Sequence, residues 1–132
     1  MDPIANMISQ LKNAGNANLK ETEVPYSKIN LAILEILRTS GFITSFAEEK
    51  KENQKYPYKI KVTLKYKSKN ELTFNNIRRV SRPGRRIYIG AGKIHQVSRG
   101  KAEVLISTSQ GVMNGKTARK KGLGGELICE VS

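Results

Sequence analysis

The chain contains few of the residues from which catalytic and metal sites are built. Its 132 residues include one cysteine, one histidine, one aspartate and no tryptophan. A single cysteine excludes an internal disulfide and any metal site with several cysteine ligands, and it favours a reducing compartment. A Ser-His-Asp triad would need Asp2, which we interpret as a helix cap, and there is no Gly-x-Ser-x-Gly segment. We therefore expect a protein that is not an enzyme and uses no metal or other cofactor.

Long apolar runs are missing as well. No stretch approaches the roughly 20 apolar residues that a membrane-spanning helix requires. The N-terminus lacks the charged start and apolar centre of a signal peptide. We expect no membrane partner, and a cytoplasmic location.

Acidic residues are scarce, and their distribution along the chain is uneven. The 24 lysine and arginine residues outnumber 11 aspartate and glutamate residues, which gives a net charge of +13. Residues 1–71 hold 12 basic and 8 acidic side chains, a net of +4, whereas residues 72–132 hold 12 and 3, a net of +9. Such a surplus predicts a polyanionic partner, bound by phosphate neutralisation and counterion release. We expect the second half of the chain to bind it.

The N-terminal half has the apolar pattern of two helices on a small sheet. Asp2 and the proline after it predict a helix start, and Gly15 is expected to end that helix, with Lys12 and Asn13 in its last turn. A second helix is expected between Ser27, as its cap, and the glycine at 41.

Two strands are expected after the second helix, at 42–47 and 58–66. The latter segment alternates apolar residues with lysine and threonine, which is typical of a half-buried strand. Its lysine face would be the solvent side of the sheet, with RNA contact as the alternative. A polar stretch at 67–70 predicts the boundary between an N-terminal lobe, 1–68, and a C-terminal lobe, 69–132.

The C-terminal lobe is rich in predicted strands and turns. Strands are expected at 72–80, 87–89, 104–106 and 127–131, and a few helical turns at 117–121. Cys129 alternates with apolar residues on the last strand, so we expect it in the core. The predicted fold class is α+β, with an N-terminal α/β lobe of two helices on a small sheet. That lobe would pack on a β-rich C-terminal lobe with one short helix.

One segment resembles a phosphate-binding loop. Residues 111–117, Gly-Val-Met-Asn-Gly-Lys-Thr, follow a predicted strand and open a predicted helix, but only three residues separate the glycines where that loop needs four. The 15 residues after Thr117 are too few for the further strands and the magnesium-binding carboxylate of an NTPase. An NTPase is kept only as an alternative. His95 stands among basic residues, and we expect it in a loop rather than as a general base.

Arginines crowd the segment 78–89. Five of them occur within nine positions, at 78, 79, 82, 85 and 86, and guanidinium groups match phosphate geometry. Alternation places Ile87 and Ile89 on one strand face and Tyr88 on the other. Tyr88 is therefore expected to be exposed, where its ring can stack on an unpaired base.

Three hydroxyl residues in a row, Ser107, Thr108 and Ser109, stand between a predicted strand and a basic helix. Taken locally, they are either the polar end of a strand that caps the next turn or an RNA contact. Short hydroxyl side chains suit an irregular RNA helix that is recognised by shape and by its 2′-hydroxyls. A glycine-rich segment, 122–126, follows shortly after.

Five segments together carry a family resemblance. They are DPIANM at 2–7, KNA at 12–14, SRPGRRIY at 81–88, VLISTSQGVM at 104–113 and GLGGELIC at 122–129. In this order and spacing they closely resemble the bacterial-type small-subunit ribosomal protein S8 family, over essentially the whole chain.

The resemblance implies a primary rRNA-binding protein that docks on a central-domain rRNA helix and supports assembly of the small subunit. Neighbouring small-subunit proteins would be further partners, on a cytoplasmic or organellar ribosome. Repression of translation by binding the operon's own messenger RNA is the alternative. The charge pattern and the resemblance together predict these RNA-binding residues: Lys12, Asn13, Arg82, Arg86, Tyr88, Ser107, Thr108, Ser109, Gln110, Lys116, Arg119, Gly124, Gly125 and Glu126.

The chain departs from the family pattern in two basic segments. Asn-Gly-Lys-Thr at 114–117 stands where the family usually has Thr-Asp-Arg-Glu, which removes two acids and a capping box. Arg85 replaces a usual apolar residue. We expect added positive charge and a less stable short helix.

Overall fold

The computed structural model describes residues 2–53, 55, 57–68, 71–74, 76–97 and 103–132. The chain divides into two compact units, Met1–Phe74 and Asn75–Ser132. Each unit combines helices with antiparallel strands, which confirms the predicted α+β class. Among the described residues, no helix has the length and apolar character needed to cross a membrane.

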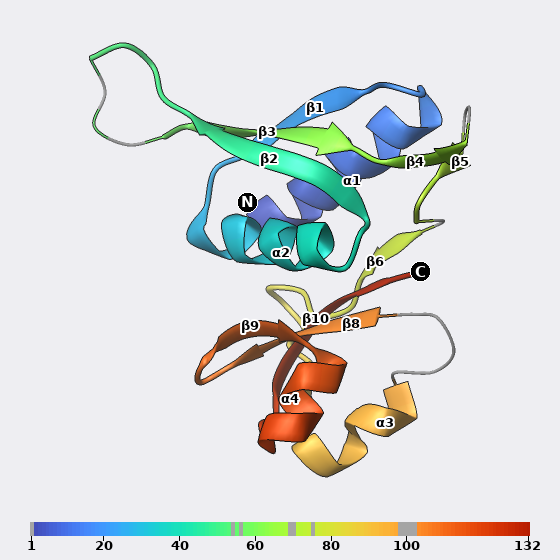
Figure 1. Cartoon of the computed structure of the whole chain (residues 1–132). Coiled ribbons are helices and arrows are strands. Elements are labelled where there is room, and N and C mark those ends of the chain that lie inside the picture. The colour runs from blue at the N-terminus through green and yellow to red at the C-terminus, as the bar shows by residue number, and fades with distance from the viewer. Residues whose placement is uncertain (1, 54, 56, 69–70, 75, 98–102) are drawn as a thin grey trace. The chain divides into compact units, whose positions relative to one another are not determined.

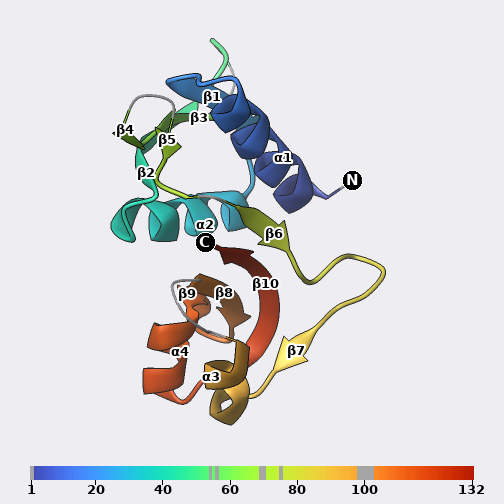
Figure 2. The ribbon, with the colours of Figure 1, turned by 90° about the vertical axis from the view of Figure 1, so that its right-hand side faces the viewer.

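In the first unit, two helices lie on one face of a three-stranded antiparallel sheet (Figures 1 and 2). The helices are α1 (Pro3–Asn16) and α2 (Lys28–Thr39), and the strands, in sheet order, are β1 (Glu21–Pro25), β3 (Lys59–Leu64) and β2 (Ile43–Glu49). Alternate residues of β3 are buried, at Ile60, Val62 and Leu64. The period-two pattern is therefore confirmed as a half-buried strand.

Both predicted helix starts are confirmed by their caps. The Asp2 carboxylate accepts a hydrogen bond from the Ile4 N–H at 3.1 Å, and the Ser27 hydroxyl accepts one from the Asn30 N–H at 3.0 Å. These bonds satisfy amide groups that the first turn of a helix leaves without a partner.

The predicted end of the first helix is wrong. Gly15 lies inside α1, which continues to Asn16, so Lys12 lies outside the last turn. A Cβ atom at Gly15 would overlap the side chain of Leu72. The lack of a side chain at Gly15 therefore allows Leu72 to approach the helix closely, and the glycine does not end the helix.

The lysine face of β3 is engaged by acidic neighbours. The Lys59 ammonium lies 2.8 Å from the Glu23 carboxylate and 3.3 Å from that of Glu49, and Lys61 lies 3.0 Å from Glu21. The hydrogen bond to Glu23 is the main reason why the pKa of Lys59 is raised. These ion pairs favour the solvent-face interpretation of this strand over RNA contact.

Two predicted strands are shorter than expected. The strand predicted at 58–66 stops at Leu64, where β3 ends. Tyr66 begins a separate strand, β4 (Tyr66–Ser68), which pairs with β5 (Glu71–Leu72). The predicted strand 72–80 is therefore wrong as one element, because its first residues belong to that hairpin and only β6 (Ile77–Arg79) joins the second sheet. Because β5 pairs with β4, the compact units divide at 74/75, later in the chain than the expected lobe boundary at 68/69.

Three residues of these predictions lie outside the described residues. They are Lys69 and Asn70 of the predicted linker and Asn75 of the predicted strand.

The second unit is built on a five-stranded antiparallel sheet. Its order is β6, β10 (Gly125–Val131), β8 (Glu103–Thr108) and β9 (Gly111–Asn114), and β7 (Tyr88–Ile89) also pairs with β10. The short helices α3 (Ile94–Val97) and α4 (Gly115–Lys121) pack on one face, with the 3-10 turn η1 (Ala91–Lys93) before α3 (Figure 1). Their core contains Ile94, Val104, Ile106, Met113, Ala118 and Leu127.

Cys129 is a buried core residue, as predicted. Its side chain is 1% exposed, and burial raises the pKa of the thiol to about 12.

The segment that resembles a phosphate loop is a strand followed by a helix. Residues Gly111–Asn114 form β9, which pairs with β8, so this stretch does not form a loop whose amides wrap a phosphate. The Asn114 side chain accepts a hydrogen bond from the Thr117 N–H at 2.8 Å, which is one of the two bonds that a capping box would supply. Gly122, with φ at 68°, ends α4. His95 was expected in a loop, but it lies on α3, a single helical turn that the sequence did not predict.

Candidate nucleic-acid interface

Three predicted RNA-binding residues form a row across three strands. In the register of the sheet, Glu126 on β10 lies opposite Tyr88 on β7 and opposite Ser107 on β8. Directly paired residues of antiparallel strands point to the same face, with Cβ atoms about 4.5–5.5 Å apart. The Tyr88 ring is 71% exposed. The sheet therefore presents an aromatic ring, a carboxylate and a hydroxyl side by side.

Gly124 and Gly125 allow β10 to pass closely between its neighbours. A Cβ at Gly125 would overlap the carbonyl oxygen of Ser107, and one at Gly124 would contact the Ile89 carbonyl oxygen. Because glycine has no side chain, the backbones reach a distance that no other residue permits. The glycine pair thus brings Glu126 level with Tyr88 and Ser107.

Two groups hold the Glu126 carboxylate in place. The Ser81 hydroxyl donates a hydrogen bond to it at 2.5 Å, and the Arg86 guanidinium donates another at 2.9 Å. Burial alone would raise the pKa of Glu126, but the bonds from Ser81 and Arg86 outweigh it and hold the pKa below its usual value. The carboxylate is therefore charged and fixed at neutral pH.

Ser81 is a residue of the site that sequence reasoning missed. It is fully buried, and its hydroxyl also accepts a hydrogen bond from the Ile87 N–H at 3.1 Å. In the sequence it has the position of an ordinary turn residue before Arg-Pro-Gly. No local signal links it to a carboxylate 45 residues later.

The hydroxyl cluster lies at the tip of the β8–β9 hairpin. Ser107 and Thr108 end β8, and Ser109 and Gln110 form the exposed turn before Gly111. The Thr108 hydroxyl donates to the Gly111 carbonyl at 2.8 Å and accepts from the Gln110 N–H at 3.1 Å. Within the described part of the chain, the hydroxyls of Ser107 and Ser109 form no hydrogen bond. Thr108 thus caps its own turn, whereas the two serines are available to a ligand.

The arginine segment surrounds a hollow of about 290 Å³. Its lining is Arg78, Arg79, Arg82 and Arg85, together with Val80 and Ile87. Glu130 pairs with Arg78 at 2.6 Å, and the Ile128 carbonyl accepts a hydrogen bond from Arg79 at 2.9 Å.

Arg82 and Arg85 hold each other across the turn through two backbone hydrogen bonds of 3.1 and 2.9 Å. Among the residues that the structure describes, their exposed side chains have no partner. Arg78 already pairs with Glu130, and the positive charges of the other three arginines around the hollow favour an anion such as phosphate.

Comparison with known proteins agrees with this geometry. The family model described as Ribosomal protein S8 matches residues 2–132. The chain belongs to the ribosomal protein S8 family. It is 43% identical over 130 residues to the small ribosomal subunit protein uS8 of Sorangium cellulosum, covering 98% of this chain and 97% of that protein. It is 42% identical over 137 residues to the uS8 protein of Thermus aquaticus, with the same coverage, and 37% identical over 130 residues to that of Geobacter sp., covering 98% and 96%.

Membership in the S8 family confirms the resemblance seen in the sequence. It makes the chain a structural constituent of the small ribosomal subunit, and it implies rRNA binding within a ribonucleoprotein that serves translation. The S8 family is one of structural proteins.

The other predicted RNA-binding residues lie elsewhere. Lys116 and Arg119 are exposed on α4, whose layer covers the sheet face opposite to the row of Tyr88, Glu126 and Ser107. Lys12, half-buried, and Asn13, exposed, lie on α1 of the first unit. In the described ranges, no three His, Cys, Asp or Glu side chains gather as metal ligands.

Proposed function

We propose that the second unit reads an irregular helix of small-subunit rRNA and that the protein docks on a central-domain rRNA helix during subunit assembly. The observation that carries this proposal is the row of Tyr88, Glu126 and Ser107 beside the exposed hairpin tip. This row offers an aromatic ring, a fixed acceptor and hydroxyls on one face of the sheet.

The chemistry of the row suits RNA in particular. The ring of Tyr88 can stack on an unpaired base, and the Glu126 carboxylate can accept hydrogen bonds from base amino groups or 2′-hydroxyls. Ser107, Ser109 and Gln110 can donate and accept hydrogen bonds at close range. Specificity would come from these groups, because each requires a matching group on the RNA.

Cationic side chains would supply the affinity. Arg82, whose guanidinium has no partner among the described residues, would bind phosphates together with Arg85 at the 290 Å³ hollow. Arg86 would approach the RNA beside Glu126, and Lys116 and Arg119 would contribute from α4. We also propose RNA contacts for Lys12 and Asn13 of the first unit.

The same surface would bind a messenger RNA that presents the same shape, so repression of its own operon's translation is a second proposed role. Neighbouring small-subunit proteins complete the proposed set of partners, on a cytoplasmic ribosome. The strand at Gly111–Asn114 argues against the alternative of an NTPase.

The test compares Ser109→Ala with the wild type on two RNAs, a central-domain rRNA fragment and an unstructured RNA of equal length. Loss of the serine hydroxyl should weaken binding to the rRNA fragment by about 1–3 kcal/mol, because a buried partner on the RNA is left unpaired. Binding to the unstructured RNA should stay unchanged. Ser45→Ala, in the exposed part of β2, is the matched control. Equal losses on both RNAs would show that Ser109 does not determine specificity.

A further inference from the structure

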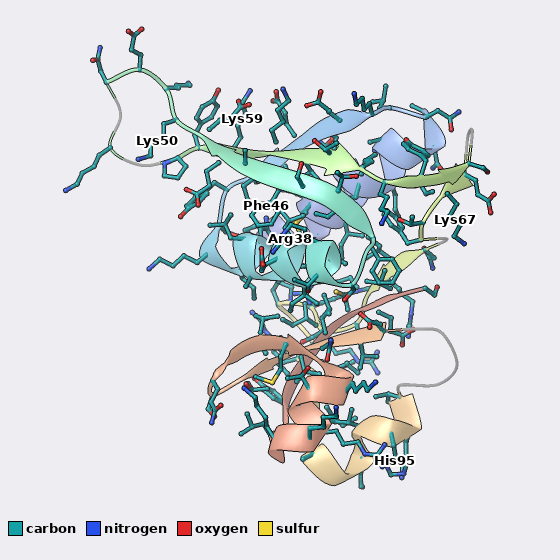
Figure 3. The ribbon with its side chains drawn as sticks, in the orientation of Figure 1. Arg38, Phe46, Lys50, Lys59, Lys67 and His95 are labelled. Carbon is teal, nitrogen blue, oxygen red and sulfur yellow. The ribbon has the colours of Figure 1, made fainter. Side chains whose placement is uncertain are left out.

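The helical layer of the second unit contains a hollow of about 350 Å³. It is lined by Ile94 and His95 of α3 and by Gly115, Lys116 and Arg119 of α4. The two helices lie side by side in Figures 1 and 2, and Figure 3 shows His95 on α3. The hollow thus depends on α3, the element that sequence reasoning missed.

This hollow is separate from the surface that carries Tyr88. Ile106 and Leu127, which pair in the sheet, pack with Ile94 of α3 and Ala118 of α4. The neighbouring pair, Ser107 and Glu126, points to the opposite face, because successive residues of a strand alternate. A ligand in the hollow therefore lies on the opposite side of the sheet from Tyr88, Glu126 and Ser107.

Two cationic side chains, Lys116 and Arg119, line the hollow together with the imidazole of His95. His95, Lys116 and Arg119 are exposed, and within the ranges that the structure describes none of them has an ion pair or a side-chain hydrogen bond. Among the described residues, no carboxylate belongs to the lining, whereas Lys59, Lys61, Arg78 and Arg86 elsewhere in the chain all pair with glutamates. The buried Ile94 and Gly115 form an apolar floor. Fixed charges of one sign that converge without a counter-charge favour an anionic ligand.

The size and donors of the hollow fit a phosphate group with part of its nucleoside. Its volume lies near the lower end of the roughly 300–1,000 Å³ typical of small-ligand pockets. The planar guanidinium of Arg119 can donate two parallel bonds to phosphate oxygens, and Lys116 adds a point charge. The imidazole of His95 can donate a hydrogen bond or stack on a base.

We infer that this hollow binds a backbone phosphate of a second RNA segment, distinct from the segment read by the sheet face. Lys116 and Arg119 contact the phosphate oxygens, and His95 contacts the adjoining sugar or base. The inference rests on the proposed rRNA binding and adds a second point of attachment, so that the unit joins two segments of RNA.

The experiment uses the full chain and three single variants, His95→Gln, Lys116→Gln and Arg119→Gln. Lys93→Gln, on η1 and outside the lining, removes one charge close by and is the matched control. Affinity for rRNA that contains the central domain is measured between about 0.05 and 0.2 M salt. Each lining variant should weaken binding by about 3- to 10-fold. Lys116→Gln and Arg119→Gln should also make the negative slope of log K against log salt shallower by about 0.7–0.9. Lys93→Gln should change both the affinity and the slope less than these variants do.

Losses no greater than that of Lys93→Gln would overturn the inference. All four altered residues are exposed, so circular dichroism melts should match the wild type.

A second arm identifies the source of the phosphate. Inorganic phosphate and AMP are titrated into the isotope-labelled chain, and amide and imidazole NMR signals are followed. If AMP shifts the signals of the lining residues while the variants leave rRNA affinity unchanged, the hollow is a free-nucleotide site and the RNA assignment is wrong. The proposed function fails separately, when the wild-type chain does not prefer rRNA over unstructured RNA.

Discussion

Tyr88 lies directly opposite Glu126 where β7 pairs with β10, so an exposed ring stands beside a fixed carboxylate. Neither residue is needed to fill the core, since Ile87 and Ile89 of the same segment pack against it. The carboxylate, in turn, is oriented by Ser81 and Arg86. At Tyr88 the proposed RNA contact can therefore be altered without loss of stability, whereas Glu126 also contributes to the fold through its bonds with Ser81 and Arg86.

Removal of the Tyr88 ring should weaken RNA binding with no loss of stability. Tyr88→Ala should lower the affinity for a central-domain rRNA fragment by about 1–3 kcal/mol, the usual contribution of one base stacked on an aromatic side chain. Tyr88→Phe should retain most of the affinity, because the ring remains. Filter binding or fluorescence anisotropy measures both, with Tyr58→Ala, 42% exposed in the first unit, as control. Equal affinities of Tyr88→Ala and the wild type would remove Tyr88 from the interface.

Arg82 should contribute through charge rather than through base recognition. Arg82→Gln should reduce the slope of log K against log salt by about 0.7–0.9, the contribution of one phosphate contact, on rRNA and on unstructured RNA alike. Arg38→Gln is a suitable control because Arg38 is paired with Glu35 on α2. A salt slope equal to that of the wild type would exclude Arg82 from the phosphate contacts.

Gly125 should tolerate no side chain. Gly125→Ala should destabilise the second unit by about 1–3 kcal/mol, because the new Cβ overlaps the Ser107 carbonyl and the strands must separate. Gly90→Ala is the matched control, since its Cβ would meet nothing within 4 Å and its φ of −80° suits any residue. Denaturant unfolding measures both. Similar unfolding midpoints for the two variants would contradict the close approach of β10 to β8.

The free energy of unfolding should fall at acid pH, in part because Glu126 becomes protonated. The pKa of this carboxyl is lower in the folded chain than its ordinary value of 4.5, so it stabilises the fold above that pH. The contribution is lost as pH falls through the folded-state pKa. Urea unfolding between about pH 6 and pH 3 should therefore show a weaker pH dependence for Glu126→Gln than for the wild type. Glu48→Gln, an exposed carboxylate, is the control, and identical profiles for Glu126→Gln and Glu48→Gln would contradict the role of Ser81 and Arg86.

The sequence predicted those elements whose signals are local. Caps at Asp2 and Ser27, the glycine after α2 and the alternation in β3 all depend on a few neighbouring residues, and the structure shows each of them. The exposure of Tyr88 followed in the same way from alternation with Ile87 and Ile89.

The elements that the sequence did not predict are short or depend on distant partners. A single turn such as α3 is too short for helical periodicity, and β9 buries only Met113 of its four residues. Gly15 had the appearance of a helix end because its partner, Leu72, is far away in the sequence. The bond from Ser81 to Glu126 likewise joins residues that only the sheet brings together.

The place of β10 also sets an order of events during synthesis. In the sheet of the second unit, β10 pairs with β6, β7 and β8, which all precede it in the chain. Among the described strands of that sheet, β8 and β9 are therefore the one pair that forms without β10. Units of a chain generally fold from the N-terminus as they are made, and the first unit is complete at Phe74. A nascent chain can therefore carry a folded first unit while Tyr88 and Ser107 still lack the strand that aligns them. On the proposed function, selective binding of RNA would therefore require that residues 125–131 have been made and have paired with β7 and β8.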